Sequence, residues 1–369
     1  MGDYNKNPFV QSEILPVDFV FHQSWWNKHA GIVFDEDFYY HPLKRVEVER
    51  QMEKELFERF GKFGLGDDYK IELPVIGPVH NASGYIISEM LGCKVTYPEN
   101  SAPQVIPAGR ERIDVDVNPF KTDSFRKLEK LRDSLKTKYG YIVGDINWSG
   151  ILNTALDIIG EKVFTDFFIE PEEIRKEMQY LASVLEKFAV YISKETGTNS
   201  ISVNRNVRNI KKPVFLHSEC SHTMIPTELY EEFLMPIDMT WSEKYRPFGI
   251  HYCGKDPHRY AGSFGKIKNL DFLDLGWGGD VKVLRKHLPN TFFNIRLDPV
   301  AINNYSEDEI RSTITRLVSE SQNPCLTGIC CINMDDKVED SKIVAILQTV
   351  ANLREDLNKH QTNKYEINL

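Results

Sequence analysis

The chain has 369 residues, of which 41% are hydrophobic, 27% charged and 11% aromatic. This composition excludes a disordered, collagen-like or coiled-coil protein and supplies enough apolar side chains for a sizeable core. Fifty-four acidic residues outnumber 45 basic ones, giving a net charge of −9, and the two signs are interspersed. Nucleic-acid binding would need a basic stripe, and we interpret the one short basic cluster, between Arg205 and Lys212, as a solvated loop.

The first 70 residues mix aromatic and charged side chains. No stretch approaches the roughly 20 apolar residues of a membrane span, and residues 1–12 contain no signal-peptide core. We therefore expect a cytoplasmic protein whose six cysteines are thiols or metal ligands rather than disulfides. An amphipathic helix is predicted over 43–63. The rings of His22, Trp25 and Trp26 precede it, and they indicate either a core or lid contact or a substrate site.

Residues 71–120 are rich in proline and glycine, which favours short strands and long loops. From residue 123 onwards, helical patterns alternate with short apolar runs. The predicted helices are 124–138, 171–195, 226–245, 256–265, 280–287, 306–319 and 339–357, and the predicted strands are 141–144, 213–217, 248–251, 270–274, 291–295 and 326–329. Such alternation predicts a parallel sheet with helical crossovers, and no linker divides 123–360.

Polar residues gather where these strands end. The strand-end residues are His217, Ser218, Glu219 and Cys220; His251 and Cys253; Asp274 and Gly276; Arg296 and Asp298; and Cys330 and Cys331. In a (β/α)₈ barrel they would converge on the catalytic mouth, and in a doubly wound sheet they would line a crevice at the carboxyl edge. Asn147 and Trp148, after an earlier strand, either line the same pocket or belong to a turn.

The pair His251 and Cys253 has a spacing of two, which points both side chains to one face of a strand. With a later thiol, such a pair is a plausible three-ligand zinc set with one open position. Glu219 or His217 strengthens this interpretation, because carboxylates and imidazoles also bind zinc. The alternative is that the cysteines only pack.

Five motifs occur in order along the chain. They are Pro226-Thr-Glu-Leu-Tyr-Glu-Glu-Phe-Leu-Met-Pro236, Ile250-His-Tyr-Cys-Gly254, Leu270-Asp-Phe-Leu-Asp274, Arg296-Leu-Asp-Pro299 and Gly328-Ile-Cys330. Together they resemble the uroporphyrinogen decarboxylase superfamily, and specifically its corrinoid and coenzyme M methyltransferase branch, over about 37–351. The resemblance implies a (β/α)₈ TIM barrel over 71–369, with residues 1–70 as an extension and lid over its mouth.

The resemblance also implies a zinc site. The branch's ligand motif carries over onto His251, Cys253 and either Cys330 or Cys331, of which we choose Cys330, with Glu219 as the expected fourth ligand. The decarboxylases themselves grip a tetrapyrrole with an N-terminal arginine motif, and residues 15–31 contain no arginine. Porphyrin decarboxylation is therefore a poor fit, since a polyanionic substrate needs guanidinium partners.

The expected function is zinc-dependent methyl transfer between a small methylated substrate, such as a methoxylated aromatic, and cobalamin on a separate corrinoid protein. Zinc would activate either the leaving group or a thiol acceptor; a pterin acceptor also stays open. We assign catalytic roles to His217, Glu219 and Asp298, with His217 alternatively orienting a ligand. We assign substrate contacts to His22, Trp25, Trp26, Asn147 and Trp148.

Two alternatives remain from the sequence. One is a metal-free decarboxylase or lyase that uses Asp and His at the barrel mouth. The other is a non-catalytic subunit of a corrinoid complex, in which case tight association and no turnover would be seen. No nucleic-acid or membrane partner is expected, and both a monomer and a homodimer stay open. Cys220 and Cys331 are interpreted as packing residues.

Overall fold

The computed structural model describes residues 14–68, 72, 74–76, 85–144, 149–196 and 214–366. Two predicted substrate contacts, Asn147 and Trp148, lie outside the described residues, as does the basic cluster between Arg205 and Lys212. None of the described helices is long and apolar enough to cross a membrane.

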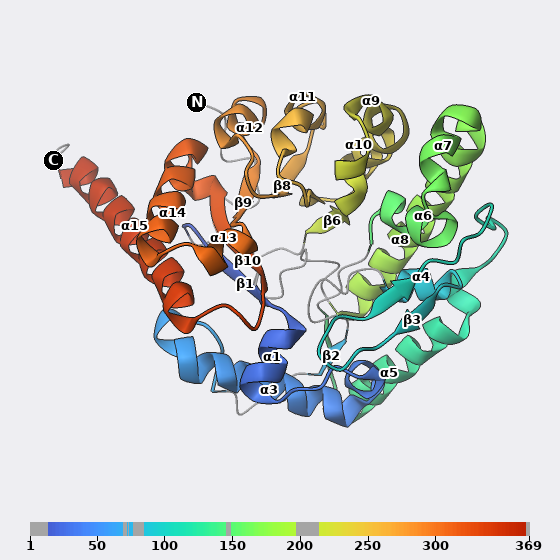
Figure 1. Ribbon diagram of the computed structural model, residues 1–369, viewed down its shortest axis with the longest axis horizontal. Helices are drawn as coiled ribbons and strands as arrows, with labels where there is room; N and C mark the ends of the chain where they lie inside the picture. Colours follow the sequence, from blue (N-terminus) through green and yellow to red (C-terminus); the bar gives the residue numbers. More distant parts are fainter. Residues whose placement is uncertain are drawn as a thin grey trace.

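A six-stranded parallel sheet organises the molecule (Figure 1). Its strands, in spatial order, are β1 (Val17–Phe21), β10 (Thr327–Met334), β9 (Phe292–Arg296), β8 (Leu270–Leu275), β7 (Phe248–His251) and β6 (Phe215–Ser218). Every neighbouring pair is parallel. Each predicted strand from 213 onwards overlaps an observed one, because buried parallel strands are continuous apolar runs that the sequence displays directly.

Two short strands, β2 (Val75–Ile76) and β5 (Val143–Gly144), form a separate parallel pair, and β3 (Lys94–Thr96) pairs with β4 (Gln104–Ile106) antiparallel. Within the described residues no ladder joins β2 and β5 to the main sheet. The structure therefore shows a curled, half-barrel sheet, and the closed eight-stranded barrel stays a prediction.

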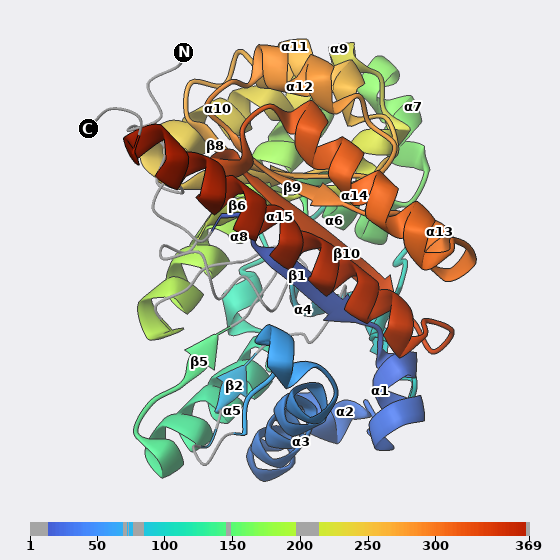
Figure 2. The same cartoon turned by 90° about the vertical axis from the view of Figure 1, so that its left-hand side faces the viewer.

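Helices surround the six-stranded sheet and the β2–β5 pair, with α2, α3 and α5 on the side of β2 and β5 (Figures 1 and 2). They are α1 (Gln23–Ala30), α2 (Glu36–Tyr40), α3 (Pro42–Phe60), α4 (Tyr85–Met90), α5 (Asp123–Tyr139), α6 (Ile151–Ile159), α7 (Lys162–Ile169), α8 (Pro171–Thr196), α9 (Thr227–Leu229), α10 (Met235–Lys244), α11 (Ala261–Phe264), α12 (Val281–His287), α13 (Pro299–Asn304), α14 (Glu307–Ser321) and α15 (Asp340–Glu366). The predicted helix 226–245 is interrupted by a π-helical turn, Tyr230–Leu234. Helix α14 begins with a capping box, in which the side chains of Ser306 and Glu309 each accept from the backbone N–H of the other residue.

The N-terminal segment is part of the sheet and not only an extension over it. Strand β1 pairs with β10, and the His22 N–H donates to the Met334 carbonyl at 2.9 Å. Trp25 and Trp26, in α1, are buried in the core, where both rings contact Phe21 with centroids 4.3 and 5.6 Å away. This packing favours the core-contact alternative for Trp25 and Trp26, and their substrate contacts stay a prediction.

The strand register gives the sheet two chemically different faces. His251 pairs with Asp274 and Asp274 with Asn294, so these side chains form one lateral row, because cross-strand neighbours share a face. Arg296, Cys330 and Asp18 form the next row on that face. Residues of alternate parity, such as Ile250, Leu273 and Ile295, belong to the main hydrophobic core instead. The concave inner face is therefore the polar one at its carboxyl end.

Replacing Trp25 with Ala should lower the free energy of unfolding by about 3–5 kcal/mol, because it leaves a large cavity in the core. The matched control is Phe168→Ala, since that ring is 73% exposed and its loss should cost under about 0.5 kcal/mol. Urea unfolding of both variants measures the difference. Equal stabilities for the two variants would contradict the core position of Trp25.

Candidate metal centre

Three potential metal ligands meet at the carboxyl ends of β6 and β7. The donor atoms of Cys220, His251 and Cys253 all lie within 4.8 Å of one another. The two sulfurs are 3.0 Å apart, and His251 Nε2 is 3.3 Å from Cys253 Sγ. His251 is fully buried, whereas both cysteines are partly exposed. The sheet thus holds the cluster on its buried side. The partly exposed cysteines leave the other side open to a reactant.

A buried carboxylate orients the histidine. His251 Nδ1 lies 2.5 Å from Asp274 Oδ2, and Asn294 donates to the other Asp274 oxygen at 3.2 Å. Burial favours a neutral ring, but the charges of Cys253 and Asp274 outweigh it and raise the pKa of His251 to about 9. A carboxylate behind an imidazole is the usual support for a metal-bound histidine, because it directs the second nitrogen at the metal.

The two thiols have opposite protonation preferences. The hydrogen bond from Cys220 lowers the pKa of Cys253 well below its usual value, against the effect of burial, and Arg296 and His251 lower it further. The same bond, with burial, raises the pKa of Cys220. Arg296 Nη1 lies 3.5 Å from Cys253 Sγ, so a buried guanidinium faces the thiolate. These contacts favour the thiolate form of Cys253 over that of Cys220.

The donor set fits a divalent zinc-like ion. Two sulfurs and one imidazole nitrogen are typical zinc ligands, and tetrahedral zinc would separate them by about 3.5–3.8 Å, a little more than observed. The pKa directions favour a proton on Cys220 and one on His251 when no metal is bound. A divalent ion would replace both protons with no change in net charge, since metal binding releases ligand protons.

A close backbone approach holds the cysteine loop in place. A Cβ on Gly276, after β8, would lie 1.7 Å from the Gly254 carbonyl oxygen, so only glycine fits there. The Tyr252 N–H also donates to the Asp274 carbonyl at 2.8 Å. Cys253 lies between these two contacts, and its sulfur is therefore placed by backbone packing.

Cys220 occupies the place that we expected for Cys330. Cys330 lies on the polar inner face, opposite Arg296 and Asp18 in register. Its sulfur, however, does not lie within 4.8 Å of both His251 and Cys253, and burial raises its pKa. Cys331 packs in the main core on the other face. Sequence reasoning took Cys220 for a packing residue; the available signal was that it follows a strand adjacent to that of His251.

Glu219 and His217 are not among the three donors of the cysteine cluster that lie within 4.8 Å of one another, and their predicted roles as fourth ligand and catalytic groups stay predictions. Glu219 accepts from the backbone of α6, at 2.7 Å from Leu152 N and 3.2 Å from Asn153 N, so it caps that helix. His217 has the opposite strand parity from His251, and its Nδ1 lies 2.7 Å from Asp238 in α10. Burial opposes its protonation, but Asp238 and Glu219 raise the pKa of His217 to about 10.

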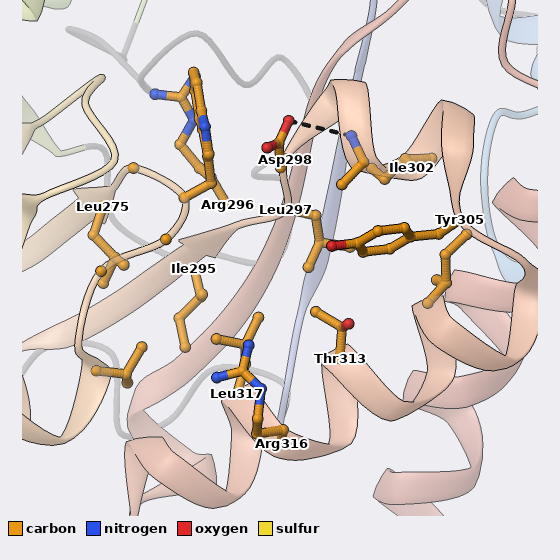
Figure 3. Close-up of a pocket in the computed structure, with 17 residues that line it drawn as sticks. Leu275, Ile295, Arg296, Leu297, Asp298, Ile302, Tyr305, Thr313, Arg316 and Leu317 are labelled. Carbon is orange, nitrogen blue, oxygen red and sulfur yellow. Dashed lines mark hydrogen bonds between the residues drawn. The ribbon is translucent and has the colours of Figure 1, made fainter.

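Asp298 is also a helix cap. Its carboxylate accepts from Val300 N at 2.9 Å and from Ala301 N at 3.3 Å, at the start of α13. It lines a cavity of about 220 Å³ between the ends of β8 and β9 and the helices α12 to α14 (Figure 3). The walls drawn there are mainly apolar, with Ile295, Leu297 and Leu317. The structure thus gives Asp298 a helix-capping role at the wall of this cavity, and its catalytic role stays a prediction.

His22 remains near a cavity at the carboxyl edge. Its Nδ1 accepts from the Ser24 N–H at 3.1 Å and caps α1, and its side chain lines a hollow with Asn333, Asp335 and Asp336. Burial lowers the pKa of His22 despite these nearby carboxylates. Because β1 and β10 end here, this hollow opens at the same edge of the sheet as the cysteine cluster.

Asp18 is a buried acid that the sequence analysis did not single out. It lies on the inner face of β1, opposite Cys330, and is 3% exposed. Burial, with a smaller effect of Asp274, raises the pKa of Asp18 to about 8. Its Oδ1 has no hydrogen-bond partner among the described residues. The sequence signal was an acidic residue at the second position of an otherwise apolar strand.

Comparison with known proteins identifies the fold. No protein-family model and no curated protein matches the sequence. One similar structure is a methyltransferase from Methanosarcina mazei, 12% identical, with a TM-score of 0.61 over 95% of this chain and 97% of that chain. Another is a B12-independent methionine synthase from Shewanella sp. W3-18-1, in complex with selenomethionine, 10% identical, with a TM-score of 0.55 over 95% of this chain and 100% of that chain. These likenesses establish a shared fold along nearly the whole chain.

The raised pKa of Asp18 predicts a pH-dependent stability. The folded state binds this proton more tightly than the unfolded chain, whose Asp pKa is about 3.9, so the stabilisation is complete below that pH and is lost as pH rises towards about 8. We expect metal-free Asp18→Asn to lose less stability between pH 5 and 8 than the parent chain, measured by urea unfolding. The exposed Asp116→Asn is the control. Parallel profiles for the parent and Asp18→Asn would show that Asp18 titrates normally.

Proposed function

We propose that this chain is a metal-dependent methyltransferase whose zinc ion is held by Cys220, His251 and Cys253. The observation that carries the proposal is the convergence of these three donors on one point, with Asp274 behind the histidine. Two proteins of the same fold, from Methanosarcina mazei and Shewanella, are described as a methyltransferase and a methionine synthase, which supports methyl transfer as the reaction class.

The chain's own residues would supply orientation and charge. Asp274 fixes the His251 tautomer, and Arg296 compensates the negative charge of Cys253 within a buried, low-dielectric face. Zinc at this site would supply Lewis-acid activation of a thiol or of the leaving group of a methylated substrate. The partly exposed side of the cysteines leaves an approach for that reactant.

The carrier and the substrate are less constrained. We propose cobalamin on a separate corrinoid protein as methyl carrier, on the family resemblance of the motifs. One of the two similar structures is described as B12-independent, so fold likeness does not choose between a corrinoid and a direct thiol or pterin acceptor. The burial of Trp25 and Trp26 removes the reason for a methoxylated aromatic, and the proposal is limited to a small methylated substrate reaching the mouth near His22.

Metal analysis of single variants tests the site. The purified protein should bind zinc, and Cys220→Ser, His251→Ala and Cys253→Ser should each weaken binding at this site by at least the 10–100-fold typical of losing an outer-shell partner. Cys330→Ser should retain zinc affinity, which distinguishes the geometry from our sequence-based choice. Competition with a chromophoric chelator gives the affinities.

Cys325→Ser is the matched control, because Cys325 is partly buried in a 3₁₀ turn before β10, away from the cluster. Loss of zinc from Cys330→Ser with retention in Cys220→Ser would replace Cys220 by Cys330 in the ligand set. Unchanged affinity in both His251→Ala and Cys253→Ser would overturn the metal site altogether.

Methyl transfer itself is measured with small methyl ethers, thioethers and amines as donors. With cob(I)alamin as acceptor, we expect methylcobalamin to appear in the visible spectrum, and we expect chelation to abolish the rate and zinc to restore it. A thiol acceptor without cobalamin provides the parallel test of direct transfer. Methyl transfer that survives complete chelation would contradict the metal-dependent mechanism.

A further inference from the structure

We propose a second, fully buried metal centre formed by His217, His222 and Asp238, separate from the cysteine cluster. The donor atoms of the three residues lie within 4.8 Å of one another, and all three side chains are buried. They come from β6, from the 3₁₀ turn Cys220–Met224 and from α10. The centre thus lies on the helix-facing side of β6, and it is independent of the function proposed above.

His222 provides the observation that points to a ligand. Its side chain is 0% exposed, and neither ring nitrogen has a hydrogen-bond partner among the described residues. An unsatisfied buried polar group costs about 1–3 kcal/mol. The surroundings are aromatic, with the Tyr230 ring centroid 4.8 Å away and that of Tyr260 5.8 Å away. A phenylalanine would suit such surroundings without this cost, so the two unpaired ring nitrogens point to an occupant.

The neighbouring donors define that occupant as a cation. His217 Nδ1 is 2.7 Å from Asp238 Oδ1, and the Tyr230 hydroxyl donates to Asp238 Oδ2 at 2.8 Å. His222 therefore faces an imidazole and a carboxylate that is already oriented by a phenol. Two imidazoles and one carboxylate are the donor set of many zinc and iron(II) sites.

Protonation and charge are consistent with a divalent ion. Binding would release the His217 Nδ1 proton to solvent, and a +2 ion would meet one carboxylate and two neutral rings. His217 Nε2 now accepts from the Ile151 N–H at 3.4 Å, so ligation through Nδ1 would give up this contact and place the remaining hydrogen on Nε2, 3.6 Å from Glu219 Oε2. Because all three ligands are buried, the ion would be structural. It would tie the turn that carries Cys220 to α10.

The test is a cobalt titration of the metal-free, full-length chain. We expect two equivalents to bind, one with an intense thiolate-to-cobalt charge-transfer band from the cysteine cluster, and one with only weak visible bands from nitrogen and oxygen ligands. His222→Asn should remove the second equivalent and keep the charge-transfer band. Cys253→Ser should do the reverse, so the two sites can fail separately. His287→Asn, at an exposed position, is the matched control and should bind two equivalents.

A single equivalent in the parent chain, lost on Cys253→Ser and retained in His222→Asn, would overturn the proposal and leave His222 with an uncharged occupant such as water. If His222→Asn does not fold, the parent chain still decides the matter by its stoichiometry. Zinc should then also raise the melting temperature of Cys253→Ser, and no shift in that variant would count against the second centre.

Discussion

The structure depends on the register between β7 and β8, which sets His251 beside Asp274 on the inner face. Their hydrogen bond is buried, so its charges interact in a low dielectric and each group needs the other. Asn294, one strand further, satisfies the remaining carboxylate oxygen, and Arg296 balances the thiolate of Cys253. A shift of one residue in this register would turn the whole row into the helix-packed core. The position of the candidate site is therefore set by the register of the sheet strands more than by any loop.

The alternating direction of side chains along a strand also explains why the residues from His217 to Cys220 contact three different parts of the structure. His217 points away from the inner face towards α10, Glu219 turns to the start of α6, and Cys220 approaches Cys253. Adjacent residues at a strand end cannot all enter one site, because successive side chains alternate in direction and the chain then bends into a turn. Glycine at position 150 is part of this arrangement, since a Cβ there would lie 2.3 Å from Glu219 Oε2.

The two ends of the chain are joined within one unit. β1 pairs with β10, and the Arg354 guanidinium of α15 donates to the carbonyls of Ile14 and Leu15. The aromatic residues of α1 continue this contact by packing into the core beside α3. This segment therefore supplies both an edge strand of the sheet and rings of the core. Residues 17–30 thus contribute stability, and His22 is the member of its aromatic group that lines the open hollow.

The sequence by itself determined the alternation of buried strands and helices, the capping box of α14, and the pairing of His251 with Cys253. These depend on periodicity and spacing, which are local. Tertiary structure alone decided that Cys220 meets Cys253, that Glu219 and Asp298 cap helices, that Trp25 is enclosed, and that Asp18 faces the inner row. Those outcomes depend on which strands become neighbours and on which face each side chain takes. Pairing between distant segments is fixed by the packing of the whole chain, and no single stretch of sequence records it.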